Sequence, residues 1–199
     1  MIIIMDILKK YWCERGHFNK DQFVFMNRLV MQKKPKYCLE TGFCTGRSAL
    51  CVLYGNSDIK KFINIDINYD YFREGRIMLK KFQERWKIFK GIESRSQSIL
   101  TDEFFKYEYP NGIDWFTVDG DHTYKGCYND IEKALPYMNE GGIIIVDDYM
   151  SGPPNGCKIP EVTRACDDIN RKYGDKLDME SWNKKGKGFC IFTIGISKQ

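Results

Sequence analysis

The stretch Tyr37-Cys-Leu-Glu-Thr-Gly-Phe-Cys-Thr-Gly-Arg-Ser-Ala-Leu50 joins an apolar run, a glycine-containing turn and the start of a second apolar segment. This order is typical of a buried strand that passes through a tight loop into a helix. Gly42 and Gly46 permit such a loop. Its free N–H groups, together with the positive dipole end of the following helix, favour a bound anion. The stretch therefore predicts a small-molecule site after the first strand.

Glu40 changes which ligand this loop is expected to take. It stands where a dinucleotide-binding G-x-G-x-x-G loop would have its first glycine, and a carboxylate there would repel a diphosphate. A ligand with both an ammonium and a carboxylate fits better, because Glu40 would take the ammonium indirectly or through water and the loop amides would take the carboxylate. The methionine part of S-adenosylmethionine has both groups. The alternative is an ordinary strand-turn-helix with a solvated glutamate.

Composition indicates one globular domain. The chain has 199 residues, of which 43% are hydrophobic, and a net charge of +4 with lysine and arginine interleaved among acidic residues. This pattern favours a mixed solvated surface over a nucleic-acid-binding stripe. Residues 1–5 are too short for a signal core, and no run reaches the ~18 apolar residues of a membrane span, so we expect a cytoplasmic protein without membrane contact. The eight cysteines form no C-x-x-C pair and are expected to be buried free thiols.

Apolar runs alternate with helical segments along the chain. Strands are expected at about 36–40, 62–66, 86–92, 113–118 and 142–146, and helices at about 5–14, 19–33, 69–82, 124–138 and 161–173. A short helix toward Phe105, capped by Ser94 or Ser96, is expected after the third strand. A loop is expected at 153–156, and a terminal hairpin at 176–182 and 188–195 around Asn183-Lys-Lys-Gly-Lys-Gly188.

The two strands at 113–118 and 142–146 are almost continuously apolar, as parallel strands covered on both faces are. The alternation therefore predicts an α/β, doubly wound, mostly parallel sheet that ends in an antiparallel hairpin. We expect a domain of residues 35–199, preceded by an N-terminal helical extension of residues 1–34.

Acidic residues follow several of the predicted parallel strands. Asp66, Asp119, Asp147 and Asp148 stand at the ends of the second, fourth and fifth strands. Carboxyl ends of parallel strands share one edge of a sheet, and ligands bind there beside the point where strand order reverses. Asp66 would accept hydrogen bonds from the two ribose hydroxyls of a nucleoside. A role for Asp66 as a turn former or helix cap is the alternative.

Taken together, Glu40-x-Gly-x-x-x-Gly46, Asp66, Asp119-Gly-Asp-His-Thr-Tyr124 and Gly141-Gly-Ile-Ile-Ile-Val-Asp-Asp-Tyr149 resemble class I S-adenosylmethionine-dependent methyltransferases. The most similar are the macrocin O-methyltransferase-like and catechol-type metal-dependent groups. The resemblance covers about residues 36–195 and implies a seven-stranded Rossmann-like methyltransferase fold. The cofactor-binding residues that it implies are Glu40, Gly42, Thr45, Gly46, Asp66, Ser96, Gln97, Asp119 and His122.

The resemblance also implies a magnesium site at Asp119, Asp147 and Asp148. Three converging carboxylates with no lysine or arginine in their motifs would repel one another unless a divalent cation or bound protons relieved the repulsion. Such a cation would take two vicinal acceptor oxygens and lower the pKa of a hydroxyl. In the alternative interpretation, Asp148 and Asp121 only cap neighbouring turns, Asp121 as the N-cap of the helix at 124–138.

His122 and Asp119 are the candidate catalytic bases. His122 follows Asp119 by three positions, where the catechol-type relatives have a lysine base, and the near-neutral pKa of a histidine suits this role. A contact with adenine is the alternative for His122, and a passive loop role is another. Tyr124 and Lys125 are further candidates, or a surface pair at a helix start.

The expected function is magnesium-assisted transfer of a methyl group from S-adenosylmethionine to a hydroxyl of a small molecule, a sugar or a phenol. One alternative is an RNA- or nucleotide-directed methyltransferase, which the basic patch Lys184-Lys185-Gly-Lys187 permits. Others are a non-catalytic binding protein on the same fold and a nucleotide-sugar or NAD-dependent oxidoreductase, against which Glu40 argues. Residues 1–32 have apolar side chains at helical spacing, which indicates core packing or a homodimer surface, or a lid over the acceptor pocket.

Overall fold

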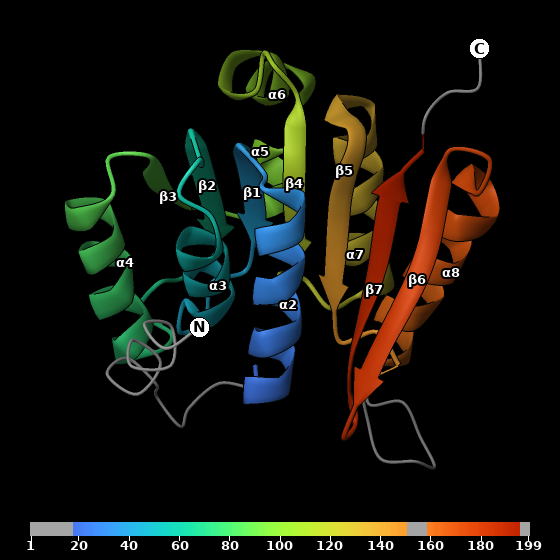
Figure 1. Cartoon of the computed structure of the whole chain (residues 1–199), viewed down its shortest axis with the longest axis horizontal. Coiled ribbons are helices and arrows are strands. Elements are labelled where there is room, and N and C mark those ends of the chain that lie inside the picture. The colour runs from blue at the N-terminus through green and yellow to red at the C-terminus, as the bar shows by residue number, and fades with distance from the viewer. Residues whose placement is uncertain (1–17, 151–158, 196–199) are drawn as a thin grey trace.

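The computed structural model describes residues 18–150 and 159–195. The helix expected at 5–14 and the loop expected at 153–156 lie outside these residues. Within them, one sheet is covered by helices on both faces (Figure 1). Its strands are β1 Tyr37–Thr41, β2 Lys61–Asp66, β3 Phe89–Glu93, β4 Ile113–Val118, β5 Met138–Asp147, β6 Leu177–Lys184 and β7 Lys187–Ile194. The helices are α2 Lys20–Lys33, α3 Arg47–Gly55, α4 Arg73–Arg85, α5 Ser96–Ile99, α6 Asp102–Glu108, α7 Tyr124–Ala134 and α8 Pro160–Tyr173, with a 3-10 turn at Leu135–Tyr137.

The strand order β3-β2-β1-β4-β5-β7-β6 fixes where a ligand can bind. The five strands β1 to β5 are parallel, and the order reverses between β1 and β4, which lie side by side. β7 then pairs antiparallel with both β5 and β6. The predicted doubly wound, mostly parallel seven-stranded sheet with a C-terminal antiparallel hairpin is confirmed.

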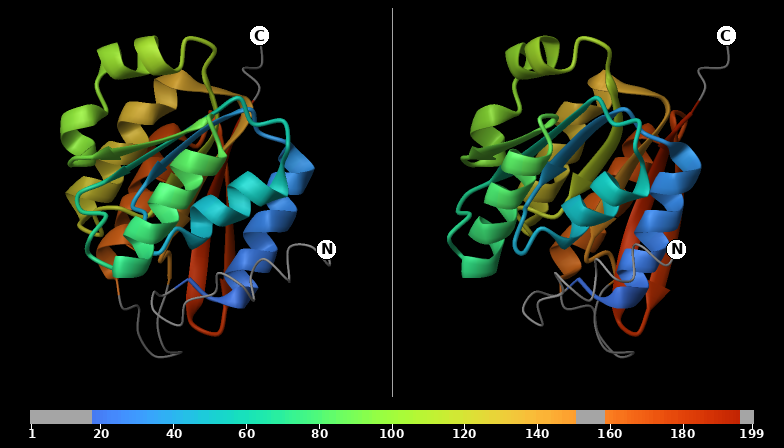
Figure 2. Two further views of the ribbon diagram at one scale, coloured as in Figure 1. Left: turned by 90° about the vertical axis from the view of Figure 1, so that its left-hand side faces the viewer. Right: turned by 60° about the vertical axis from the view of Figure 1, so that its left-hand side comes forward.

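Two hydrophobic layers hold the sheet, one on each face. Successive residues of a strand point to opposite faces, so Cys38 packs in the layer under α2, α3 and α4, while Leu39 packs in the layer under α5 to α8. Trp115 and Phe116 of β4 divide in the same way, and all four side chains are fully buried. Figure 2 shows the two sets of helices on either side of the sheet.

The helix α2 belongs to the packed core. It begins with a capping box in which Gln22 N donates to Asn19 Oδ1 and Asn19 N donates to Gln22 Oε1. Its apolar face, with Phe23, Met26 and Val30, is buried in the same layer as the sheet residues. The core packing expected of this N-terminal segment is therefore confirmed for residues 20–33, whereas a homodimer surface stays a prediction.

Several element boundaries differ from the expected ones. The helix expected from 69 begins at Arg73, and the strand expected from 86 begins at Phe89, because Trp86 still ends α4 through a bond from its N–H to Phe82 O. Two short helices, α5 and α6, replace the single one expected. Neither Ser94 nor Ser96 caps them: Thr101 caps α6 by accepting from Phe104 N at 3.2 Å, and α5 has no side-chain cap.

Two further boundaries follow from local chemistry. The helix expected to reach 138 ends at Ala134, since Pro136 has no N–H for a helical bond, and β5 correspondingly begins at Met138. The expected terminal loop is instead a two-residue turn, Lys185-Gly186, with both φ angles positive (56° and 74°). Lys184 therefore pairs directly with Lys187, a geometry that suits a twisted hairpin.

Candidate functional site

A cavity of about 600 Å³ lies at the carboxyl ends of the parallel strands, beside the point where strand order reverses. This volume is typical of small-molecule sites. The predicted site residues that line it are Gly42, Thr45, Asp66, Ser96, Gln97, Asp119, His122, Asp147 and Asp148. Glu40 and Gly46 do not line it. The fold thus brings residues that follow all five parallel strands to one cavity.

The glycine loop is held tightly against the end of β4. Gly42 has a φ of +83°, and a Cβ added there would lie 1.9 Å from the carbonyl oxygen of Asp119. Gly42 N donates to Ile65 O at 2.9 Å, and Gly46 N donates to Phe43 O at 2.7 Å. Both glycines are therefore required by the loop conformation, and their N–H groups are used within the protein.

Asp66 binds the loop from the neighbouring strand. Its Oδ2 accepts from Phe43 N at 2.6 Å and from Cys44 N at 3.4 Å, and its Oδ1 accepts from Asn68 N at 2.8 Å. The loop amides that were expected to take a ligand carboxylate thus point at Asp66 instead. A carboxylate has about four lone-pair sites, so Asp66 retains capacity for a ribose hydroxyl.

Glu40 lies behind the loop and is fully buried, so the solvated glutamate considered above is wrong. Its Oε2 accepts from Asn64 Nδ2 at 2.8 Å, and the same nitrogen donates to Gly42 O at 2.9 Å. Burial raises the pKa of Glu40 to about 8, although the hydrogen-bonding side chains of Ser48 and Asn64 lower it. Burial therefore favours the neutral form of Glu40 over a fixed negative charge.

On the side of α5, Ser96 and Gln97 line the cavity. Gln97 Nε2 donates to Asp121 Oδ2 at 3.2 Å, and Asp121 Oδ1 accepts from Thr123 N at 3.0 Å. The N-cap of α7 is Thr123, which accepts from Gly126 N at 3.1 Å, so Asp121 is not the cap. Asp121 instead stabilises the turn that leads into α7 by accepting these two hydrogen bonds.

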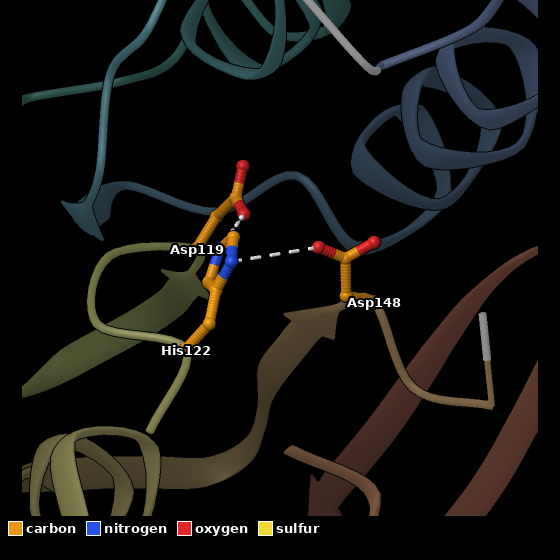
Figure 3. Close-up of side chains that lie close together, drawn as sticks. All are labelled: Asp119, His122 and Asp148. Atoms are coloured by element: carbon orange, nitrogen blue, oxygen red, sulfur yellow. Dashed lines mark hydrogen bonds and ion pairs between the residues drawn. The ribbon is translucent and has the colours of Figure 1, made fainter. Parts of the chain in front are cut away.

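Asp119, His122 and Asp148 form a cluster whose potential ligand atoms lie within 4.8 Å of one another. Figure 3 shows the imidazole of His122 between the two carboxylates. His122 Nε2 lies 3.2 Å from Asp119 Oδ1, and Nδ1 lies 3.8 Å from Asp148 Oδ2. In this cluster His122 takes the place expected of Asp147, whose Oδ1 accepts from Gln22 Nε2 at 2.7 Å.

The charges of the cluster differ from expectation. The hydrogen bond to Asp119 raises the pKa of His122 to about 9, above the near-neutral value expected, against the lowering effect of desolvation. Burial raises the pKa of Asp119 and of Asp147. Lys187 Nζ lies 3.6 Å from Asp148 Oδ1. The carboxylates thus have two cationic neighbours, His122 and Lys187, and the sequence pointed to His122 alone.

The expected basic patch is paired with acids. Lys184 Nζ lies 2.9 Å from Asp21 Oδ1, Lys185 Nζ lies 3.6 Å from Asp21 Oδ2, and Lys187 faces Asp148 as described. Each lysine of the patch therefore has a carboxylate within 4 Å, which weakens its case as an RNA-binding surface.

Sequence reasoning missed three residues around the cavity: Gln22, Arg47 and Lys187. Arg47 lines the cavity, is 6% exposed, and donates from Nη1 to Phe18 O at 2.5 Å. A signal for Arg47 existed, because a cation in the first turn of a helix opposes the helix dipole and needs another reason to be there. Gln22 had no such signal, since its partner lies 125 residues away.

The donor groups suit a divalent cation. Asp119 and Asp148 supply carboxylate oxygens, which magnesium, calcium and manganese prefer. His122 adds an imidazole nitrogen, which manganese, iron or zinc accept more readily than magnesium does.

Among residues 18–150 and 159–195, no helix is both long and apolar enough to cross a membrane.

The chain is similar to one protein family and to several curated proteins. A family described as a methyltransferase domain matches residues 39–149. A caffeoyl-CoA O-methyltransferase from Stellaria longipes is 30% identical over 119 residues, which are 60% of this chain and 48% of that protein. An uncharacterized protein from Acanthamoeba polyphaga mimivirus is 40% identical over 60 residues, 30% of this chain and 27% of that protein. The chain thus spans less than half the length of these relatives.

Solved structures show the same fold. An O-methyltransferase from Bacillus cereus in complex with SAH superposes with a TM-score of 0.73 at 15% identity, over 97% of this chain and 89% of that chain. An O-methyltransferase from Streptomyces achromogenes in complex with SAM has a TM-score of 0.70 at 14% identity, over 98% and 89% of the two chains. At these identities, the likeness is one of fold.

Proposed function

The chain belongs to the methyltransferase-domain family, and from this premise we propose that it transfers a methyl group from S-adenosylmethionine to a hydroxyl of a small molecule, assisted by a divalent cation. The observation that carries the proposal is the single strand-end cavity, which unites the glycine loop, Asp66 and the Asp119–His122–Asp148 cluster. A sugar or a phenol with vicinal oxygens is the acceptor that such a cluster suits.

In this proposal the cofactor lies across the strand ends. Asp66 would accept a hydrogen bond from a ribose hydroxyl, and Ser96 and Gln97, which line the same cavity, would contact adenine. The loop amides already donate within the protein, so we assign the methionine carboxylate to the side of Thr45 and Arg47, which supply a hydroxyl and a guanidinium. Glu40 would act indirectly: it would hold the glycine loop in place through Asn64, whose amide donates both to Glu40 and to Gly42 O.

The chemistry requires positioning above all. The acceptor oxygen would attack the sulfonium methyl in line, and the carbon–sulfur bond would break. The hydroxyl proton would pass to His122, which is hydrogen-bonded to Asp119 and must first lose to solvent the proton that its pKa of about 9 retains at neutral pH. Asp119 and Asp148 of the cluster would hold the divalent cation, and Asp147, which lines the same cavity, would be the third carboxylate ligand while His122 serves as the base. When bound, the cation would orient vicinal acceptor oxygens and lower the pKa of the reacting hydroxyl.

Cofactor binding tests the first part of the proposal. Isothermal titration of the protein with S-adenosylhomocysteine should show binding, and Asp66→Ala should weaken it by about 10- to 100-fold, because a charged hydrogen-bond acceptor for the ribose is lost. Asp70→Ala is the matched control, since Asp70 is an exposed acid on the same loop that pairs with Arg76. Wild-type protein that binds no cofactor would end the proposal.

Metal dependence tests the second part. Methylation of a catechol probe should fall after treatment with a chelator and return when magnesium or manganese is added. Asp148→Ala should abolish this recovery without abolishing cofactor binding, because Asp148 belongs to the cluster and not to the glycine loop. Turnover that is indifferent to chelator would remove the cation from the mechanism and leave methyl transfer standing.

A further inference from the structure

We infer that Gln22 is a positioning residue for the active site: its amide fixes the carboxylate of Asp147 and so couples the N-terminal helix α2 to the cluster at the strand ends. The inference rests on the proposed function, because it assigns Asp147 to the cation-binding group. Gln22 does not line the cavity, and its effect passes through Asp147.

The contact is buried and specific. Gln22 is 0% exposed and Asp147 is 7% exposed, and Nε2 donates to Oδ1 over 2.7 Å. Asp147 Oδ1 also accepts from the N–H of Asp148 at 2.8 Å. The hydrogen bonds of Asp147 to other described residues therefore all use Oδ1. Two donors on one oxygen fix the rotation of the carboxyl group and leave Oδ2 available to a ligand of the cavity.

The capping box determines which way the Gln22 amide points. Its Oε1 is engaged at the helix start, where it accepts from Asn19 N at 3.0 Å. Because the carbonyl oxygen is used there, the NH₂ group faces Asp147. Glutamine and glutamate both serve at this position of a capping box, but only glutamine also presents a donor. The site therefore explains why residue 22 is glutamine.

The charge at the strand ends makes this donor useful. Asp147 lines the same cavity as Asp119 and Asp148, so its carboxylate has like-charged neighbours there. A neutral amide donor stabilises the carboxylate form without adding a cation that would compete with a metal ion. Outer hydrogen-bond partners of this kind typically change metal affinity 10- to 100-fold when they are removed.

The test compares three variants of the full chain. Gln22→Leu removes both bonds of the amide, Gln22→Glu keeps the capping bond but turns a second carboxylate toward Asp147, and Asn19→Ala removes the cap but leaves the Gln22 amide. Titration with S-adenosylhomocysteine, which should bind all three within about threefold of wild type, shows that each is folded. Affinity for Mn²⁺ alone is then measured by electron paramagnetic resonance on the cofactor-loaded proteins.

Both Gln22 variants are expected to bind Mn²⁺ about 10- to 100-fold more weakly than wild type, whereas Asn19→Ala should bind it within about twofold. Asn19→Ala should instead lower the melting temperature by a few degrees, since it loses a helix cap. Unchanged Mn²⁺ affinity in Gln22→Leu, or an equal loss in Asn19→Ala, would overturn the inference, the latter because it would indicate a structural role alone.

Crystal structures of wild type and Gln22→Leu separate this inference from the proposed function. If wild type binds cofactor but no Mn²⁺, the metal part of the proposed function fails. The positioning role then stands if the Asp147 carboxyl rotates in Gln22→Leu, and it falls if the carboxyl keeps its orientation. Wild type that binds no cofactor contradicts the methyltransferase proposal, and the same pair of structures still decides whether Gln22 positions Asp147.

Discussion

At the scale of single residues, Glu40 shows how burial changes a group that the sequence presents as a charge. The sequence predicts a carboxylate that attracts an ammonium, but the strand places it at 0% exposure with the amide of Asn64 as its partner. Its position could be predicted from the motif. Its protonation could not, because it depends on the layer of side chains that closes over it.

Glu40 should make the protein less stable as pH rises. Its pKa is about 8 in the folded chain and near 4.5 when unfolded, so the folded state binds more protons between these values. The free energy of unfolding should therefore fall from about pH 4.5 to about pH 8 and level off above. Glu40→Gln should flatten this part of the profile, as followed by urea denaturation from pH 5 to 9. Glu84→Gln, at an exposed site, should leave the slope as in wild type.

Gly42 is expected to tolerate no side chain. A Cβ would meet the Asp119 carbonyl at 1.9 Å, and the backbone has a φ of +83°, so Gly42→Ala must separate the ends of β1 and β4. We expect cofactor binding to be lost in calorimetric titration. Gly141→Ala is a useful comparison, because Gly141 also has a positive φ, +73°, but a Cβ added there would have nothing within 4 Å. Equal effects of the two changes would mean that backbone strain, and not the close approach, matters.

At the scale of elements, the start of α7 positions His122. Thr123 caps this helix one residue after His122, so the turn that holds the imidazole depends on the cap. Thr123→Ala should lower the free energy of unfolding by about 1 kcal/mol and weaken Mn²⁺ binding as well. Thr101→Ala removes an equivalent cap from α6, away from the cluster, and should cost similar stability with no change in Mn²⁺ affinity. A loss of Mn²⁺ affinity in both would indicate a general loosening.

Element types could be predicted more reliably than their ends. The parallel strands could be identified from short, almost continuously apolar runs such as Ile113–Val118, which are typical of strands covered on both faces. The helix ends near Trp86 and Ala134 could not be predicted, because they depend on the last hydrogen bonds of each helix. The hairpin loop expected around residues 183–188 was in the right place but too long, for a related reason: Lys185 adopts a left-handed conformation that its residue type does not favour.

At the scale of the whole molecule, the sequence predicted where the site lies but not all of the residues that surround it. Motif spacing sufficed to place Asp66, Asp119 and Asp148 around one cavity, because parallel strand ends share an edge. Gln22 and Lys187 reach the same region from α2 and from the hairpin. The Gln22–Asp147 contact joins residues 125 positions apart, and the Lys187–Asp148 contact joins the ends of two antiparallel strands. No local sequence pattern predicts either contact.

The packing of α2 predicts that it unfolds together with the sheet. Met26 is fully buried in the layer that also contains Trp115, whereas Met31 is 51% exposed on the same helix. Met26→Ala should lower the free energy of unfolding by about 2–5 kcal/mol, and Met31→Ala should change it by less than about 0.5 kcal/mol. Urea unfolding should show one transition by both fluorescence and circular dichroism. A separate early transition in Met26→Ala would mean that α2 is an independent unit.

The described thiols have one further consequence. Cys38, Cys51, Cys127, Cys166 and Cys190 are buried, while Cys44 is partly accessible in the glycine loop and lines the cavity. In a background with Cys13→Ser and Cys157→Ser, alkylation of the native protein by iodoacetamide should therefore mark Cys44 first. A molecule seated against the loop would shield this sulfur. The rate of labelling then becomes a footprint of occupancy, by which unknown acceptors and inhibitors can be screened before any turnover assay exists.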